Sequence, residues 1–123
     1  MTTALIIEDN DDNMELISFI LKNESYDLIQ AKSGEDGVDM ALEHKPDVII
    51  LDIQLPGIDG YEVLKRIRAS EIDGSIPVIA MTSYAMSGDR ERLLAAGCNG
   101  YIEKPISPEV VAKQIRAIIE KRR

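Results

Sequence analysis

The sequence predicts a doubly wound α/β domain, with a parallel five-stranded sheet between two layers of helices. Five short apolar runs rich in Ile and Val alternate along the 123 residues with segments whose apolar residues recur every three or four positions. Parallel neighbours need crossover connections, and helical crossovers cover both faces of a sheet. A chain of this length suits a single domain, which we expect to span residues 1–123.

The apolar runs define the expected strands, which are residues 4–7, 26–31, 47–51, 77–81 and 99–102. Two of them, 47–51 and 77–81, are almost continuously apolar. Such runs are typical of strands buried on both faces, so we place these two in the middle of the sheet.

Three of the expected helices have a clear start in the sequence. The first follows the polar stretch 10–13 and repeats apolar residues at Leu16, Ile17, Ile20 and Leu21. The second follows Ser33 and has two acidic residues in its first turn, and the last begins at Ser107 and Pro108. Capping side chains, early acidic residues and an early proline all favour a helix start.

Charge and composition exclude several classes of protein. Fourteen Lys and Arg against 22 Asp and Glu give a net charge of −8, which disfavours direct binding to nucleic acid. The apolar runs are far shorter than the roughly 20 residues that cross a bilayer, so no membrane insertion is expected. The N-terminal residues do not resemble a secretory signal, and the single cysteine cannot form an internal disulfide. A cytoplasmic protein is the expectation.

Polar side chains follow four of the predicted strands at their carboxyl ends, where open parallel sheets form their binding sites. They are three carboxylates, a hydroxyl and an ammonium group: Glu8, Asp9, Asp52, Thr82 and Lys104. The sole cysteine and the sole histidine, Cys98 and His44, lie elsewhere, so neither a thiolate zinc site nor a Ser-His-Asp triad fits.

Clustered carboxylates point to a hard divalent cation. They raise one another's pKa unless a cation joins them, and they suit Mg²⁺, with Mn²⁺ as the alternative. A magnesium ion in turn favours phosphoryl chemistry. Asp52 ends a buried central strand and is the expected nucleophile, whereas Lys104 and Thr82 are the groups expected to contact phosphoryl oxygens.

These residues stand in motifs that resemble the response-regulator receiver domain, the phosphoacceptor of two-component signalling. The motifs are LIIEDN at 5–10, VIILDIQLPGIDG at 48–60, IAMTS at 79–83, AAG at 95–97 and YIEKP at 101–105. The resemblance covers nearly the whole chain and implies a flavodoxin-like fold with strand order 2-1-3-4-5. The start of the chain, with Asn13 after the acidic pair, is also similar to receivers of hybrid histidine kinases and of stand-alone DivK-like regulators.

The resemblance assigns roles to individual residues. It implies phosphorylation of Asp52 by a phosphohistidine of a histidine kinase or a histidine phosphotransfer protein. It implies a magnesium site formed by three carboxylates and one backbone carbonyl, from Glu8, Asp9, Asp52 and Gln54. Thr82 and Tyr101 would form the switch, and Lys104 would contact the phosphate.

The resemblance also bears on partners and on the lifetime of the phosphoryl group. Residues expected to dock the kinase are Asn13, Met14, Ile17 and Pro105, although Met14 and Ile17 also fit a hydrophobic core. A cis bond is expected between Lys104 and Pro105, and Gln54 and Tyr84 are expected to tune hydrolysis of the phosphoryl group. With no output domain expected in the chain, the signal would pass to an unknown downstream protein by binding. The domain would catalyse its own phosphorylation and slow dephosphorylation without being a conventional enzyme.

Other interpretations of the same residues remain open at this point. Glu8 and Asp9 suit the entrance of the following helix, and Tyr101 suits a static, half-buried position. A phosphohydrolase similar to the haloacid dehalogenases would use Asp9 as nucleophile. A pure interaction module would never turn over phosphate.

Overall fold

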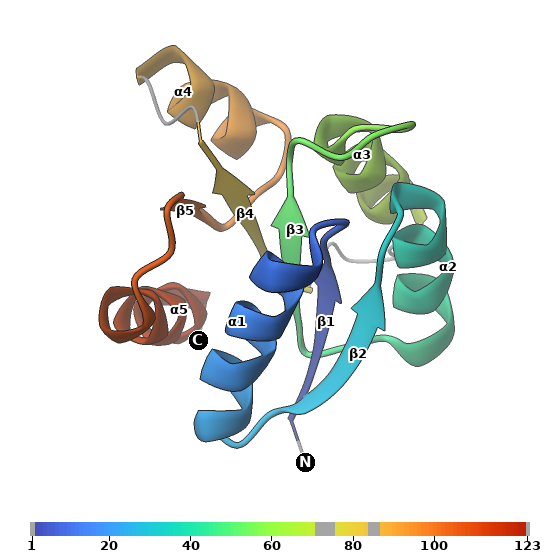
Figure 1. Cartoon of the computed structure of the whole chain (residues 1–123). Coiled ribbons are helices and arrows are strands. Elements are labelled where there is room, and N and C mark those ends of the chain that lie inside the picture. Colours follow the sequence, from blue (N-terminus) through green and yellow to red (C-terminus); the bar gives the residue numbers. More distant parts are fainter. Residues whose placement is uncertain (1, 71–75, 84–86, 123) are drawn as a thin grey trace.

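The structure is a computed structural model that describes residues 2–70, 76–83 and 87–122. Strands and helices alternate strictly along these residues, as the sequence predicts (Figure 1). The strands are β1 (Thr3–Ile7), β2 (Asp27–Ala31), β3 (Val48–Asp52), β4 (Val78–Thr82) and β5 (Gly100–Glu103). The helices are α1 (Asp11–Asn23), α2 (Gly34–His44), α3 (Gly60–Ser70), α4 (Ser87–Ala95) and α5 (Pro108–Arg122).

The strands form one parallel sheet in the order β2-β1-β3-β4-β5, which confirms the expected topology. β3 and β4 are buried along their full length and lie inside the sheet, as their continuous apolar runs predict. Because all strands run the same way, their carboxyl ends meet at one edge of the sheet, marked by the arrowheads in Figure 1.

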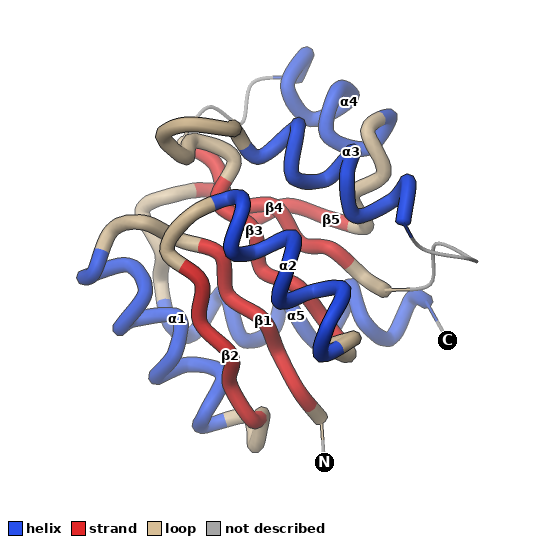
Figure 2. Tube along the Cα trace, turned by 90° about the vertical axis from the view of Figure 1, so that its right-hand side faces the viewer, coloured by secondary structure: helices blue, strands red, loops and turns tan. Residues whose placement is uncertain are grey.

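Two hydrophobic cores lie on opposite faces of the sheet. One packs α1 and α5 against alternate residues of the strands, including Ile6, Ile50 and Met81. The other packs α2, α3 and α4 against the remaining residues, such as Ile7 and Leu51. Figure 2 shows this layering, with α2 in front of the sheet and α1 and α5 behind it. The alternation of side chains along each strand explains why continuous apolar runs are needed.

The helix starts follow the predicted signals. The Asn10 side chain accepts a hydrogen bond from the Asn13 backbone N–H at 2.9 Å, and the Ser33 hydroxyl accepts one from Asp36 at 3.2 Å. α5 begins at Pro108, as expected. In the part of the chain that the structure describes, no helix combines the length and apolar character needed to span a membrane.

The predicted strand ends were wrong by one residue. Asp52 and Thr82 are the last residues of β3 and β4 and do not follow them, because both are still paired in the sheet and nearly fully buried. Of the two adjacent valines in α5, Val111 is buried in the core, whereas Val110 is 52% exposed.

Gly60 at the start of α3 is required by its packing against the loop after β3. A Cβ atom at this position would lie 2.4 Å from the Ile53 Cα and 2.9 Å from the Asp52 carbonyl oxygen, and neither backbone atom can move aside cheaply. We expect Gly60→Ala to lower the free energy of unfolding by about 2–3 kcal/mol, as overpacking does elsewhere. Urea denaturation measures this change. The control Lys65→Ala, on the exposed side of α3, should change stability by less than about 0.5 kcal/mol; equal stabilities would contradict the prediction.

Candidate functional site

Three carboxylates meet at the carboxyl edge of the sheet, and we call Glu8, Asp9 and Asp52 the acidic site. One carboxylate oxygen from each lies within 4.8 Å of the other two. Glu8 is fully buried and Asp52 is 2% exposed, whereas Asp9 is exposed. The prediction that these three residues converge is therefore confirmed.

Strand register explains why Glu8 and Asp52 meet. β1 and β3 are neighbours, and Ile7 pairs with Leu51, so the next residue on each strand lies at the same level of the sheet. The Glu8 backbone is fixed from the other side by its N–H, which donates to the Ala31 carbonyl at 3.0 Å. The chain then enters α1 through the Asn10 cap.

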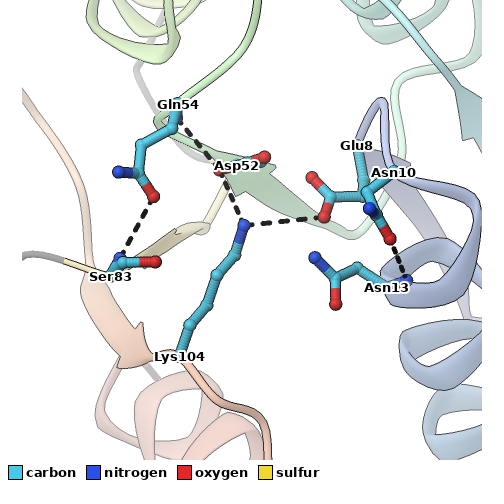
Figure 3. A network of polar contacts seen from close by, with 7 residues as sticks. All are labelled: Glu8, Asn10, Asn13, Asp52, Gln54, Ser83 and Lys104. Carbon is cyan, nitrogen blue, oxygen red and sulfur yellow. Dashed lines mark hydrogen bonds and ion pairs between the residues drawn. The ribbon is translucent and has the colours of Figure 1, made fainter.

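Lys104 lies between the two buried carboxylates (Figure 3). Its Nζ is 3.2 Å from Asp52 Oδ1 and 3.6 Å from Glu8 Oε1, and its side chain is 15% exposed. The Lys104 N–H donates to the Thr82 carbonyl at 2.8 Å, and the bond to Pro105 is cis, as expected. The ammonium group thus supplies a positive charge to the interior of the acidic site.

Gln54 makes two contacts that connect Asp52 with the loop after β4. Its backbone N–H donates to Asp52 Oδ1 at 2.9 Å, and its side-chain Oε1 accepts a hydrogen bond from the Ser83 N–H at 3.2 Å (Figure 3). Sequence reasoning expected a role only for the Gln54 backbone carbonyl and for control of hydrolysis. The contact with Ser83 was missed, because no local sequence pattern reports which loop a glutamine side chain reaches.

The pKa values of the two buried carboxyl groups, Glu8 and Asp52, are shifted in opposite directions. Burial, followed by the proximity of Asp52, raises the pKa of Glu8 from 4.5 to about 8, although Asn13 and Lys104 act against this. Burial also opposes ionisation of Asp52. The Glu8 carboxyl, the Gln54 N–H and the Lys104 ammonium outweigh it and lower the pKa of Asp52. Near neutral pH the pair therefore favours a protonated Glu8 beside an ionised Asp52.

The residues present fit a divalent cation. Both Glu8 carboxylate oxygens are buried and have no hydrogen-bond partner in the described part of the chain. A buried carboxylate that accepts no hydrogen bond and has only the Lys104 ammonium at 3.6 Å beside it is costly, and a cation bound by Glu8, Asp9 and Asp52 would reduce this cost. Oxygen ligands of this kind suit Mg²⁺, which keeps water in its remaining positions.

The raised pKa of Glu8 has a consequence for stability without metal. In the presence of a chelator, we expect the free energy of unfolding to fall as pH rises from about 5 to about 8. In this range the folded protein keeps the Glu8 proton that the unfolded chain has released, so rising pH favours unfolding. Glu8→Gln removes this titration and should reduce the slope of the free energy of unfolding against pH. Urea denaturation at several pH values measures it, and equal slopes in both proteins would contradict the prediction.

Of the two predicted switch residues, Thr82 lies at this edge, and Tyr101 lies on β5 opposite Ala80. Thr82 ends β4 and is 3% exposed. Tyr101 on β5 is half-buried against the core, and the Arg90 guanidinium of α4 lies 5.3 Å from its ring centroid. The side chain of Arg90 therefore covers Tyr101 from outside in this structure.

The prediction of a kinase-docking surface is wrong for two of its four residues, which instead take the core position that the sequence also allowed. Ile17 is fully buried and Met14 is 4% exposed, because both pack into the core beneath α1 and offer no surface to a partner. Asn13 is half-buried and Pro105 is exposed, so these two remain accessible. Tyr84, expected to tune hydrolysis, lies outside the described residues.

Comparison with known proteins identifies the family. Residues 4–116 match the response regulator receiver domain. The polar-differentiation response regulator DivK of Brucella ovis is 46% identical over 105 residues, which cover 85% of each chain.

Similar solved structures support the same family assignment. The receiver domain of a sensor histidine kinase from Pseudomonas aeruginosa, described with a magnesium ion coordinated in its active site cleft, is 34% identical, with a TM-score of 0.86 over 97% of this chain and 98% of that chain. A putative response regulator from Chloroflexus aurantiacus is 30% identical, with a TM-score of 0.89 over the same shares. The fold alone is shared with the chemotaxis response regulator CheY4 of Vibrio cholerae, at 24% identity and a TM-score of 0.90 over 96% of this chain and 98% of that chain. This chain therefore belongs to the response regulator receiver domains, the phosphoacceptor domains of two-component signalling.

Proposed function

We propose that Asp52 is the phosphoacceptor and that the phosphoryl group comes from a phosphohistidine of a histidine kinase or a histidine phosphotransfer protein. In this transfer a carboxylate oxygen of Asp52 forms the new O–P bond while the N–P bond of the phosphohistidine breaks and the imidazole leaves with the electron pair. The observation that carries the proposal is the environment of Asp52, an ionised carboxylate at a rigid strand end with a lysine ammonium 3.2 Å away.

Glu8, Asp9 and Asp52, with the Gln54 backbone carbonyl, would hold a magnesium ion. When bound, this ion neutralises charge that develops on the transferring phosphoryl oxygens. The oxygens of buried Glu8, which accept no hydrogen bond in the described part of the chain, support this assignment, as does the magnesium ion described in the receiver domain from Pseudomonas aeruginosa.

Lys104 and Thr82 would contact the oxygens of the phosphoryl group once it is on Asp52. Lys104 balances its charge as a point charge, and Thr82 donates its hydroxyl to a phosphoryl oxygen. A phosphoryl group adds about −1.5 to −2 charges at neutral pH, so it favours the position of the Thr82 hydroxyl that contacts it. Tyr101 then leaves its place under Arg90 and moves inward, which reshapes the surface of α4, β5 and α5 for a downstream protein.

Protein partners suit this domain better than nucleic acid. Its net charge of −8 opposes binding to phosphate backbones. The DivK protein of Brucella ovis, which is similar to this chain, is described as a polar-differentiation response regulator. Asn13 and Pro105, the accessible residues beside the acidic site, would contribute to kinase docking.

Mapping the phosphorylated residue tests the proposal. The protein is incubated with acetyl phosphate and Mg²⁺, and the site of phosphorylation is located by tandem mass spectrometry. Label on Asp52 that requires Mg²⁺ is the expected result. Label on Asp9 would instead indicate a phosphohydrolase similar to the haloacid dehalogenases, and absence of any label would favour a pure interaction module.

A further inference from the structure

The peptide group between Thr82 and Ser83 is held at both ends by residues that follow other strands. Its carbonyl accepts a hydrogen bond from the Lys104 backbone N–H at 2.8 Å. Its N–H donates to the side-chain Oε1 of Gln54 at 3.2 Å. One planar unit thus connects the loops after β3 and β5, and Figure 3 shows its contact with Gln54.

The geometry of the sheet fixes where this N–H points. The C=O and N–H of a trans peptide point in opposite directions. β4 lies between β3 and β5, and the carbonyl is directed to Lys104 on the β5 side. The Ser83 N–H is therefore directed to the β3 side, where Asp52 ends its strand and where Gln54 now accepts it.

Gln54 is itself tied to the carboxylate of Asp52. Its backbone N–H donates to Asp52 Oδ1 at 2.9 Å, so the residue that accepts from Ser83 also contacts the proposed phosphoacceptor. Both Gln54 and Ser83 are exposed, which leaves their contact free to exchange with water or with a new acceptor. An N–H has one proton, and a strong bond to an anionic oxygen excludes an equally good bond to Gln54.

We propose that the Gln54 side chain is a latch that holds the Ser83 N–H in the resting domain and must release it before that N–H can donate to a phosphoryl oxygen on Asp52. This inference rests on the proposed function, because it assumes that Asp52 carries the phosphoryl group. Gln54 is a positioning residue here, since it acts through the Ser83 N–H. It lowers the affinity of the resting domain for a phosphoryl group and so biases the switch toward its resting state.

The first test uses the free protein. Gln54→Met keeps an unbranched side chain of similar length but removes the acceptor, whereas Gln54→Glu retains one. In ¹⁵N-labelled protein without Mg²⁺, we expect an upfield shift and faster hydrogen exchange of the Ser83 amide in Gln54→Met. Gln54→Glu should keep this amide downfield and protected. A Ser83 amide that is unchanged in Gln54→Met would overturn the latch.

The second test measures the binding of beryllofluoride, a phosphoryl mimic that does not hydrolyse, in the presence of Mg²⁺. Effects of Gln54 on a water that attacks the phosphoryl group therefore do not influence the measured affinity. We expect Gln54→Met to bind it about twofold to tenfold more tightly than the wild type, the range that one net hydrogen bond supplies. Gln114→Met on α5 is the matched control and should change neither the Ser83 amide nor the affinity.

The outcomes distinguish failure of the latch from failure of the proposed function. Equal or weaker binding by Gln54→Met, with normal phosphorylation of Asp52 in the wild type, would overturn the latch alone. Failure of the wild type to bind beryllofluoride and to become phosphorylated would overturn the proposed function, and the latch with it. Tighter binding together with the shifted Ser83 amide is the result that supports the latch.

Discussion

Asp52→Asn is expected to abolish phosphorylation by acetyl phosphate at every Mg²⁺ concentration. Asparagine has nearly the same shape, and its carbonyl oxygen can still accept from the Gln54 N–H that now lies 2.9 Å from Asp52 Oδ1. It lacks the anionic oxygen that attacks phosphorus, so the chemistry is lost while the fold is kept. Intact-protein mass spectrometry measures the phosphorylated fraction, and urea denaturation confirms that the variant is folded.

The matched control is Asp9→Asn, which removes the exposed member of the acidic site and leaves the proposed nucleophile in place. Its phosphorylation should be weak at low Mg²⁺ and should partly recover as Mg²⁺ is raised, because two of the three carboxylates remain. Recovery in Asp9→Asn but never in Asp52→Asn identifies Asp52 as the acceptor. The reverse pattern would assign the nucleophile to Asp9.

The convergence of the site was predictable because it depends on topology more than on side-chain detail. Parallel strands bring their carboxyl ends to one edge, so any polar residue that ends an apolar run is placed near the others. This is sufficient to join Glu8, Asp52 and Lys104 from three distant parts of the sequence. Even an error of one residue at a strand end, as for Asp52, leaves the residue at the same edge.

Residues whose role depends on side-chain direction were harder to predict. Ile17 and Val110 have the same apolar character, but α1 turns Ile17 into the core while α5 leaves Val110 in solvent. The helical period alone does not fix which edge of the apolar stripe is covered. Gln54 is the clearest case, since its contact with Ser83 spans two loops and appears only when both are placed.

The acidic residues between positions 8 and 12 lie in two different environments. Glu8 is fully buried and belongs to the acidic site, whereas Asp11 and Asp12 are exposed in the first turn of α1. Asp11 forms a 2.6 Å ion pair with exposed Lys32, a contact that contributes little to stability. Adjacent acidic residues thus differ because a strand end buries one and a helix start exposes the others.

Lys104→Met is expected to change metal binding and phosphorylation in opposite directions. The Lys104 ammonium lies 3.2 Å from Asp52 and 3.6 Å from Glu8, where it competes with a divalent cation for the same carboxylates. Its removal should tighten Mg²⁺ binding about threefold to tenfold when measured at about pH 9, where loss of the Glu8 proton is favoured. Phosphorylation of Asp52 should slow about 100-fold or more, because a preorganised positive charge on the phosphoryl oxygens is lost.

Isothermal titration with Mg²⁺ and initial rates of phosphorylation measure the two effects in the same preparation. Lys32→Met is the matched control, since it removes a lysine that is 66% exposed at the same edge of the sheet and should leave both quantities nearly unchanged. If Lys104 were only a structural partner of the buried carboxylates, its loss would impair both quantities together and lower the urea midpoint. An ammonium that repels the metal and attracts the phosphoryl group gives opposite changes, because these two ligands differ in the sign of their charge.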